Sequence, residues 1–199
     1  MEKGFNPDLV IVSDDAGQFN VFLHALCWIH AERTIHKLVG FNDTQRKVLE
    51  GVRKQIWDLY RDLKNYRLTP TKKKKVRLSA RFDNIFLAKY DCFSTLTHAL
   101  SRLHKNRAEL LLVLDRPDLE LHNNLSERDI REYVTKRKIS GSTRSDLGRQ
   151  CRDTFASLKK TCRKLGVSFW SYLTDRISGK NEIPRLTDLM RIKAQESRA

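Results

Sequence analysis

Nine residues near the beginning of the chain read Leu9-Val10-Ile11-Val12-Ser13-Asp14-Asp15-Ala16-Gly17. The apolar part is rich in β-branched side chains and is followed by turn-forming residues, which is the pattern of a short buried strand. A strand that ends in an acid holds the carboxylate at the edge of the sheet, and Asp14 is the first acid after the run. Capping of the following helix is an alternative role for Asp14, and Asp15 could serve it equally well.

A second acidic signal follows much later, in Asn123-Asn124-Leu125-Ser126-Glu127-Arg128-Asp129-Ile130-Arg131. The pattern predicts a helix from Leu125 to about residue 136, with Glu127 in its first turn. Two carboxylates that converge from a strand end and a helix are what a divalent-metal phosphodiester site requires. Two structural roles compete for Glu127, namely a capping box with Asn124 and an ion pair with Arg131.

Composition limits the class of protein. The 199 residues include 40% hydrophobic side chains and carry a net charge of +15, which favours a folded protein whose partner is nucleic acid. Apolar stretches such as residues 21–29 are too short to span a bilayer, so we expect no membrane partner. The first seven residues lack a basic segment followed by an apolar one, and no secretory signal is expected.

The cysteines indicate a reducing compartment. No two of them form a Cys-x-x-Cys pair, and their surroundings are apolar. We expect reduced core residues in a cytoplasmic bacterial protein at Cys27, Cys92, Cys151 and Cys162.

Helical periodicity dominates the middle of the chain. Apolar residues recur at helical spacing from Val48 to Tyr66, and this helix is predicted to close before residues 69–71. A second helical stretch carries apolar residues over 78–103, and a short third one covers 108–114. We therefore expect an all-helical block in this part of the chain.

The flanking segments are more mixed. Residues 18–38 admit two interpretations. One is a single long helix, and the other is a short helix, then a strand near 24–28, then a helix from about Ala31. An amphipathic helix is predicted over 146–165 with Gly166 as its stop, and a short helix over 169–177. The polar residues after 177 are expected to be loose.

These patterns predict an α/β protein that is predominantly helical. Its expected parts are a sheet-forming core segment (1–40), a helical insertion (41–117), returning core helices (118–177) and a polar tail (178–199).

Basic side chains follow the second acidic signal. Arg137 and Lys138 precede the small-residue loop Ser140-Gly141-Ser142, an arrangement that suits contact with a phosphate backbone. Arg144 and the cations over 149–164 extend the positive charge, which holds DNA without reading its sequence. The run of four lysines over 72–75 is more typical of a solvated turn.

Cys27-Trp28-Ile29-His30 has the spacing of half a zinc site. No second pair with suitable spacing exists in the sequence, so structural zinc is not expected. His30 could lie beside a catalytic carboxylate and assist with phosphate charge, or it could be a hydrogen-bonded core histidine.

Three segments in order resemble the transposases of the bacterial insertion sequence 66 family. They match that family's Cys-Trp-x-His-Ala-x-Arg, Asn-Asn-x-x-Glu-Arg and Arg-Lys-x-x-Gly-Ser segments. In this chain they read Cys27-Trp28-Ile29-His30-Ala31-Glu32-Arg33, then Asn123-Asn124-Leu125-Ser126-Glu127-Arg128 with Arg131, then Arg137-Lys138-Ile139-Ser140-Gly141-Ser142. The resemblance covers roughly residues 8–175 and is weakest in the helical middle, as is usual for a variable insertion.

The resemblance implies a partial ribonuclease-H-like core with an all-α insertion and an Asp-Asp-Glu metal site. Asp14 would be the second acid and Glu127 the third, both as ligands of a two-ion Mg²⁺ site, with His30 in support. The DNA contacts implied are Arg128, Arg131, Arg137, Lys138, Ser142 and Arg144. The expected partners are transposon ends and target DNA, and also a second copy of the chain or an upstream transposase fragment.

The first acid of that site should come from a strand upstream of Asp14, which only thirteen residues precede. We therefore expect a fragment of a transposase catalytic region whose two-ion site is incomplete, and which does not cut DNA alone. The alternative is a non-catalytic basic protein that binds DNA or regulates a transposase.

Overall fold

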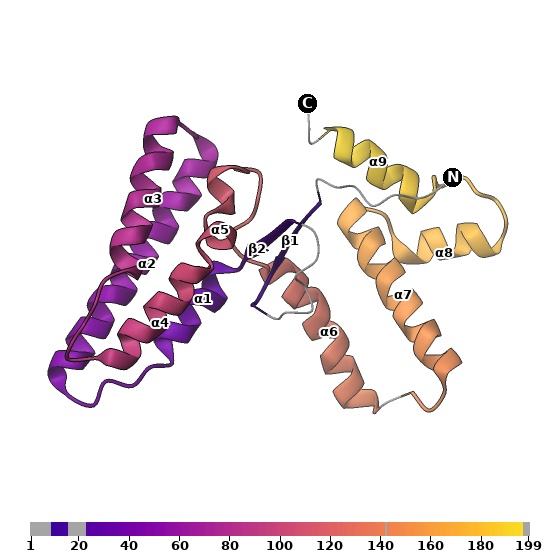
Figure 1. Cartoon of the computed structure of the whole chain (residues 1–199). Coiled ribbons are helices and arrows are strands. Elements are labelled where there is room, and N and C mark those ends of the chain that lie inside the picture. The colour runs from indigo at the N-terminus through magenta and orange to yellow at the C-terminus, as the bar shows by residue number, and fades with distance from the viewer. Residues whose placement is uncertain (1–8, 16–22, 142, 197–199) are drawn as a thin grey trace. The chain divides into compact units, whose positions relative to one another are not determined.

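The computed structural model describes residues 9–15, 23–141 and 143–196 (Figure 1). Helices dominate it and one small sheet accompanies them, so the expectation of a predominantly helical chain is confirmed. The chain divides into two compact units, residues 1–124 and 125–199. No helix in the described ranges combines the length and apolarity needed to cross a membrane.

The sheet of the first unit consists of β1 (Val10–Ser13) and β2 (Leu23–Leu26), which pair in parallel. Ser13 lies opposite Leu26, and the Ser13 Oγ is 2.7 Å from His24 Nε2, which ties the two strands together. After β2 the chain enters helix α1 (Trp28–His36) directly. Of the two interpretations for residues 18–38, the strand followed by a helix is therefore confirmed in the described residues.

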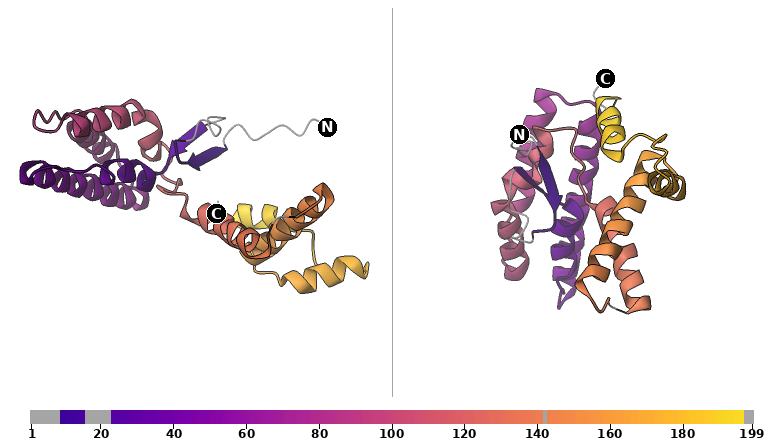
Figure 2. Two further views of the ribbon diagram at one scale, coloured as in Figure 1. Left: turned by 90° about the horizontal axis from the view of Figure 1, so that it is seen from below. Right: turned by 90° about the vertical axis from the view of Figure 1, so that its right-hand side faces the viewer.

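The helices after α1 are α2 (Asp43–Leu68), α3 (Lys72–Phe86), α4 (Ser94–Lys105), the short α5 (Arg107–Leu110) and the 3-10 turn η2 (Leu112–Leu114). Asn42 caps α2 by accepting a hydrogen bond from the Gln45 N–H, and Thr71 caps α3 in the same way. Figure 2 shows the two strands at one end of this group of helices.

The expectation of one continuous helical stretch over 78–103 is wrong. The chain turns between α3 and α4, where the Phe93 N–H donates to the Tyr90 carbonyl and the Tyr90 N–H donates to Thr97 Oγ1, each at 2.9 Å. The apolar periodicity continues across the break because α3 and α4 bury their stripes in the same core. Periodicity alone does not register such a turn.

Trp28 is the centre of this core and is 1% exposed. Its ring packs edge-on against Phe82 and Phe86, with centroids 6.1 and 6.2 Å away. Its indole N–H donates to the Leu110 carbonyl and its backbone N–H to the Leu121 carbonyl, both at 2.9 Å. One residue thereby joins the start of α1 to α3, to α5 and to the segment that leaves the unit.

The second unit contains α6 (Asn124–Ser140), α7 (Asp146–Leu165), α8 (Phe169–Ile177) and α9 (Leu186–Glu196). Helices α7 and α8 occupy the predicted residues, and Gly166 ends α7 in the left-handed conformation with φ of 76°. The expectation of a loose segment after residue 177 is wrong, because α9 packs against α7. Leu186 is buried, and Lys193 Nζ donates to the Lys164 carbonyl.

Some tryptophans and cysteines are exposed although their sequence surroundings are apolar. Trp57 and Trp170 are 37% and 72% exposed, whereas only Trp28 of the three tryptophans is buried. All four cysteines are free, with Cys27 and Cys162 buried as expected but Cys92 and Cys151 exposed. Cys92 lies in the turn between α3 and α4, and the other three exposed side chains lie on helices, where an apolar sequence context alone does not decide burial.

Substitution of Trp28 by Phe tests the role of this core residue. It removes the indole donor and leaves the buried Leu110 carbonyl without it, so unit 1 should lose about 2 kcal/mol of unfolding free energy. Urea unfolding followed by far-ultraviolet circular dichroism measures the loss. Trp170→Phe is the matched control, and at its exposed site we expect a change within about 0.5 kcal/mol. Equal effects of the two substitutions would contradict the assignment of Trp28 as the anchor.

Candidate catalytic site

The parallel strands place two functional segments at one edge of the sheet. Ser13 and Leu26 are the paired last residues of the strands, and the Cys27 N–H donates to the Ser13 carbonyl at 2.8 Å. Asp14 and Cys27 therefore leave the sheet side by side, because parallel strands end at the same edge. The Ser13 Oγ also donates to the Asp14 carbonyl at 2.6 Å, which holds the backbone of Asp14 at the strand end.

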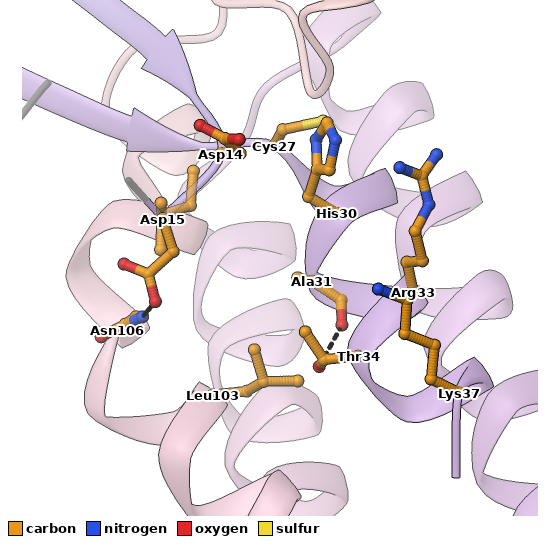
Figure 3. Close-up of a pocket in the computed structure, with 11 residues that line it drawn as sticks. Asp14, Asp15, Cys27, His30, Ala31, Arg33, Thr34, Lys37, Leu103 and Asn106 are labelled. Atoms are coloured by element: carbon orange, nitrogen blue, oxygen red, sulfur yellow. Dashed lines mark hydrogen bonds between the residues drawn. The ribbon is translucent and has the colours of Figure 1, made fainter. Parts of the chain in front are cut away.

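Asp14 and Asp15 point in different directions (Figure 3). Asp15 Oδ2 accepts a hydrogen bond from Asn106 Nδ2 at 3.2 Å, so this carboxylate is engaged with the α4–α5 junction. The Asp14 carboxylate is exposed and makes no hydrogen bond or ion pair with any residue that the structure describes. Of the two neighbouring acids, Asp14 is the one whose carboxylate has room to accept a ligand.

Helix α1 brings His30 to the same place. The helix begins at Trp28, which the core holds, and His30 therefore follows the strand edge by only one helical turn. Figure 3 shows Cys27, His30 and Arg33 across from Asp14, with Lys37 further along α1. The pattern Cys27-Trp28-Ile29-His30 is thus a strand-to-helix junction that positions His30.

These residues surround a hollow of about 240 Å³. Its lining comes from the ends of both strands, from one face of α1 and from the end of α4. The members are Asp14, Asp15, Leu26, Cys27, His30, Ala31, Arg33, Thr34, Lys37, Leu103 and Asn106. A concave site with convergent polar groups on an apolar base is the usual form of a binding site.

A three-residue polar cluster supports the wall that carries Asn106. Asp83 of α3 accepts hydrogen bonds from His104 at the end of α4, at 2.9 Å, and from Arg107 at the start of α5, at 2.8 Å. The hydrogen bond from Arg107, followed by that from His104, lowers the pKa of Asp83 below its ordinary value of 3.8. Asn106 lies between these two partners in the chain, so the cluster fixes the residue that holds Asp15.

A second polar pair orients α1. Glu32 is 6% exposed, and its Oε1 accepts from Arg53 Nε of α2 at 2.7 Å. A buried carboxylate requires such a partner. The ion pair sets the rotation of α1 and directs the next residue, Arg33, toward the hollow.

Among the described residues, no three His, Cys, Asp or Glu side chains come together in a way that could hold a metal ion. Mg²⁺ has a different requirement, since proteins usually hold it with one or two carboxylates, and waters and substrate phosphates complete the shell. The exposed Asp14 carboxylate fits the role of one such ligand.

Glu127 lies in the first turn of α6 and belongs to the second unit. The helix starts at Asn124 itself, whereas the capping box considered from the sequence needs Asn124 just before the first turn. Glu127 is half-buried on α6. Its convergence with Asp14 stays a prediction.

Two acids of α6 form ion pairs with lysines of α7. Asp129 and Glu132 face α7, where they pair with Lys159, Lys160 and Lys164. Lys164 lowers the pKa of Asp129, and Lys160 lowers that of Glu132. These three lysines therefore hold α6 to α7, contrary to the expectation that they extend a free positive surface.

The predicted DNA contacts are distributed differently. Arg128, Arg131, Arg137, Lys138 and Arg144 are all exposed and form no ion pair with residues in the described ranges. Arg131 and Lys138, seven residues apart, share one side of α6, whereas Arg128 lies one helical turn before Glu132. Ser142 lies outside the described residues.

Sequence patterns missed three members of the hollow. Asn106 is about ninety residues from Asp15 in the chain, and no local pattern links them. Thr34 and Lys37 continue the face of α1 that carries His30 and Arg33. Their helical spacing from His30 could have predicted that they share its face, but only if the start of the helix at Trp28 was known.

Two comparisons with known proteins found a match to this sequence. A profile of the Transposase IS66 family matches residues 8–151. The uncharacterized protein y4jO of Sinorhizobium fredii (strain NBRC 101917 / NGR234) is 49% identical over 174 residues, which is 87% of this chain. The match covers 54% of y4jO, so the chain spans about half the length of this relative. No solved structure matches the chain.

The Asp83 cluster makes a prediction about pH. Because the folded state lowers the pKa of Asp83, its stabilising effect is full above the unfolded value of about 3.8 and is lost as the pH falls through the lower folded value. Asp83→Asn should therefore lower the free energy of unfolding by about 1 kcal/mol at neutral pH. The loss is modest because the side chains of Arg107 and Asp83 are 41% and 33% exposed, and solvent screens their attraction. The melting temperatures of Asp83→Asn and of the wild type, measured from neutral pH downward, should become equal below pH 3.8.

The control for this experiment is Asp91→Asn, at an exposed aspartate that forms no ion pair with the described residues. We expect it to leave the melting temperature unchanged at every pH. A deficit of Asp83→Asn that persisted at the lowest pH where the protein stays folded would show that the carboxylate charge is not the cause.

Proposed function

The chain belongs to the Transposase IS66 family, and on that premise we propose that it provides part of a catalytic region that cuts and rejoins DNA strands. The reaction is phosphodiester hydrolysis followed by attack of the freed 3′-hydroxyl on target DNA. The transposon ends and the target would be its DNA partners. The observation that carries the proposal is the exposed Asp14 carboxylate at the shared end of two parallel strands, beside His30.

The proposed site uses two acids of this chain. Asp14 and Glu127 would hold Mg²⁺, because hard oxygen ligands are those that this ion prefers. A pair of bound Mg²⁺ ions would activate the attacking water and stabilise the leaving oxygen. Two acids are fewer than a complete two-ion site uses, so further ligands would come from substrate phosphates, from waters or from a protein partner.

The other site residues would act on the substrate. His30 would neutralise charge on the phosphate that faces Asp14. Arg128 and Arg131 follow Glu127 on α6, and Arg137, Lys138, Ser142 and Arg144 continue along the chain, so together they would hold the phosphate backbone near that acid. These contacts would position DNA without reading its sequence.

The proposed fold is a part of a ribonuclease-H-like core with an all-α insertion. The parallel pair β1 and β2, with α1 directly after β2, supports it. Both edges of a two-stranded sheet leave backbone groups free to pair with further strands, which could come from a second copy or from an upstream transposase fragment. We propose that the protein works in the cytoplasm, at the nucleoid.

The alternative is a non-catalytic protein that binds DNA or regulates a transposase. The net charge of +15 favours DNA binding of either kind. The catalytic function requires a metal site at Asp14, whereas the alternative requires none. A metal-binding measurement therefore separates the two functions.

Mn²⁺ serves as the probe, because its electron paramagnetic resonance signal falls when the free ion is bound. The full chain without DNA should bind Mn²⁺, and Asp14→Asn should weaken binding by on the order of tenfold or more through loss of a charged ligand. Glu127→Gln should have a similar effect if the two acids share an ion. Mg²⁺ should compete for the same site.

Asp15→Asn is the matched control. It removes an equal charge one residue away from Asp14, and the carboxylate that it removes is already hydrogen-bonded to Asn106. It should weaken Mn²⁺ binding far less than Asp14→Asn. Equal binding by wild type and Asp14→Asn would sink the metal site and leave the non-catalytic DNA-binding function. An effect of Asp14→Asn without one of Glu127→Gln would remove Glu127 from the site.

A further inference from the structure

A groove extends from the hollow at Asp14 between helices α1 and α4. It has a volume of about 490 Å³ and shares Asp15, Thr34, Leu103 and Asn106 with the hollow. Leu38, Ala99 and Leu103 form its apolar floor. We name this continuous depression the α1–α4 groove.

Exposed cations stand on both walls of the groove. Arg33 and Lys37 lie one helical turn apart on α1, and Arg102 and Lys105 lie one turn apart on α4. None of these four forms an ion pair with a residue in the described part of the chain. Many other cations of the same unit do, namely Arg46, Arg53, Arg61, Arg67, Lys75, Arg81, Arg107 and Arg116.

Carboxylates are missing where they could neutralise these cations. Helix α4 contains no Asp or Glu, and the one acid of α1, Glu32, is buried against Arg53. The helix dipole favours Arg102 and Lys105 in the last turn of α4. It does not account for the lack of acids three or four residues before them, where i,i+4 ion pairs would form at no structural cost.

The acids that line the groove are confined to one end. Asp14 and Asp15 lie at the strand edge, and Asp15 is held by Asn106. Away from that end the walls offer positive charge, the hydroxyl groups of Thr34 and Thr95, and the imidazole of His98. Cations and hydroxyls over an apolar floor suit a chain of phosphates joined by sugars.

The geometry points to the α1–α4 groove as the binding path of a DNA phosphate backbone that leads to Asp14. The inference rests on the proposed function for the choice of DNA, because the groove opens from the acid that would act on a phosphodiester. It adds a DNA-contacting surface on the first unit to the one proposed on α6. Binding would release counterions from the DNA and depend strongly on salt.

The test is fluorescence anisotropy of a short labelled DNA duplex of arbitrary sequence, titrated with the full chain at several salt concentrations. The buffer contains EDTA, so the metal site plays no part. Arg102→Gln combined with Lys105→Gln should weaken binding at every salt concentration and reduce the slope of log affinity against log salt by about 2, one for each lost phosphate contact. The pair Arg33→Gln and Lys37→Gln should do the same from the other wall.

Lys47→Gln combined with Lys54→Gln is the matched control. Both lysines are exposed on α2, line neither the hollow nor the groove, and carry the same total charge. We expect little change in the slope for this variant. Circular dichroism should show unchanged helix content in all three variants, since the substituted side chains are exposed.

Other outcomes would overturn the inference. Equal losses in the groove variants and the control would mean that net charge alone binds DNA, and no loss in the groove variants would exclude the groove. If unlabelled RNA displaced the labelled duplex from the chain at a lower concentration than unlabelled DNA does, the groove would be assigned to RNA instead. The Mn²⁺ measurement uses no DNA and this one no metal, so failure of the catalytic function and failure of the groove can be told apart.

Discussion

The seating of Trp28 is the constraint on which the rest of the first unit depends. Its ring lies against Phe82 and Phe86, its indole N–H binds the Leu110 carbonyl and its backbone N–H binds the Leu121 carbonyl. A buried tryptophan with both donors occupied has one position and one orientation. Helix α1 starts at this residue, and the last pairing of the sheet, from Cys27 to Ser13, immediately precedes it. The core thus determines where the strand edge lies relative to α1, and with it the place of Asp14 beside His30.

Polar contacts then give neighbouring charged side chains different roles: one is bound within the fold, and the next is exposed to a ligand. Asp15 is bound by Asn106, which the Asp83 cluster holds in place, while Asp14 is left for a ligand. Glu32 is bound by Arg53, while Arg33 on the next position reaches the hollow. In each pair the buried or occupied member stabilises the fold, and the exposed member is in a position to bind a charged partner.

Charge follows the same division across the chain. Lysines of α7 neutralise the acids of α6, and arginines of the first unit neutralise acids on α2, α3 and the segment after η2. The cations that remain unpaired in the described residues include those of the α1–α4 groove and, on α6, Arg128, Arg131, Arg137 and Lys138. A net charge of +15 is consequently not spread evenly over the surface. Unpaired cations repel one another, and a polyanionic partner would relieve that cost.

Local pattern was enough for several elements. The apolar run before Asp14, the helix that ends at Leu68, and α7 with its stop at Gly166 could all be read from the sequence. Three short segments in order were also enough to identify the family, because each combines rare residue types at set spacing. These features depend on neighbours within a few turns of chain, and the sequence states such neighbours directly.

Tertiary structure alone decided the contacts that join distant segments. The turn that separates α3 from α4, the engagement of Asp15 by Asn106, the pairing of the α7 lysines with α6, and the docking of α9 on α7 all depend on residues that meet only after folding. Helical periodicity marks which side of a helix is apolar, but it does not say which polar group will lie opposite. The sequence favoured Asp14 over Asp15 by its position after the apolar run, but the hydrogen bond that engages Asp15 and the groove between α1 and α4 emerged from packing and not from composition or spacing.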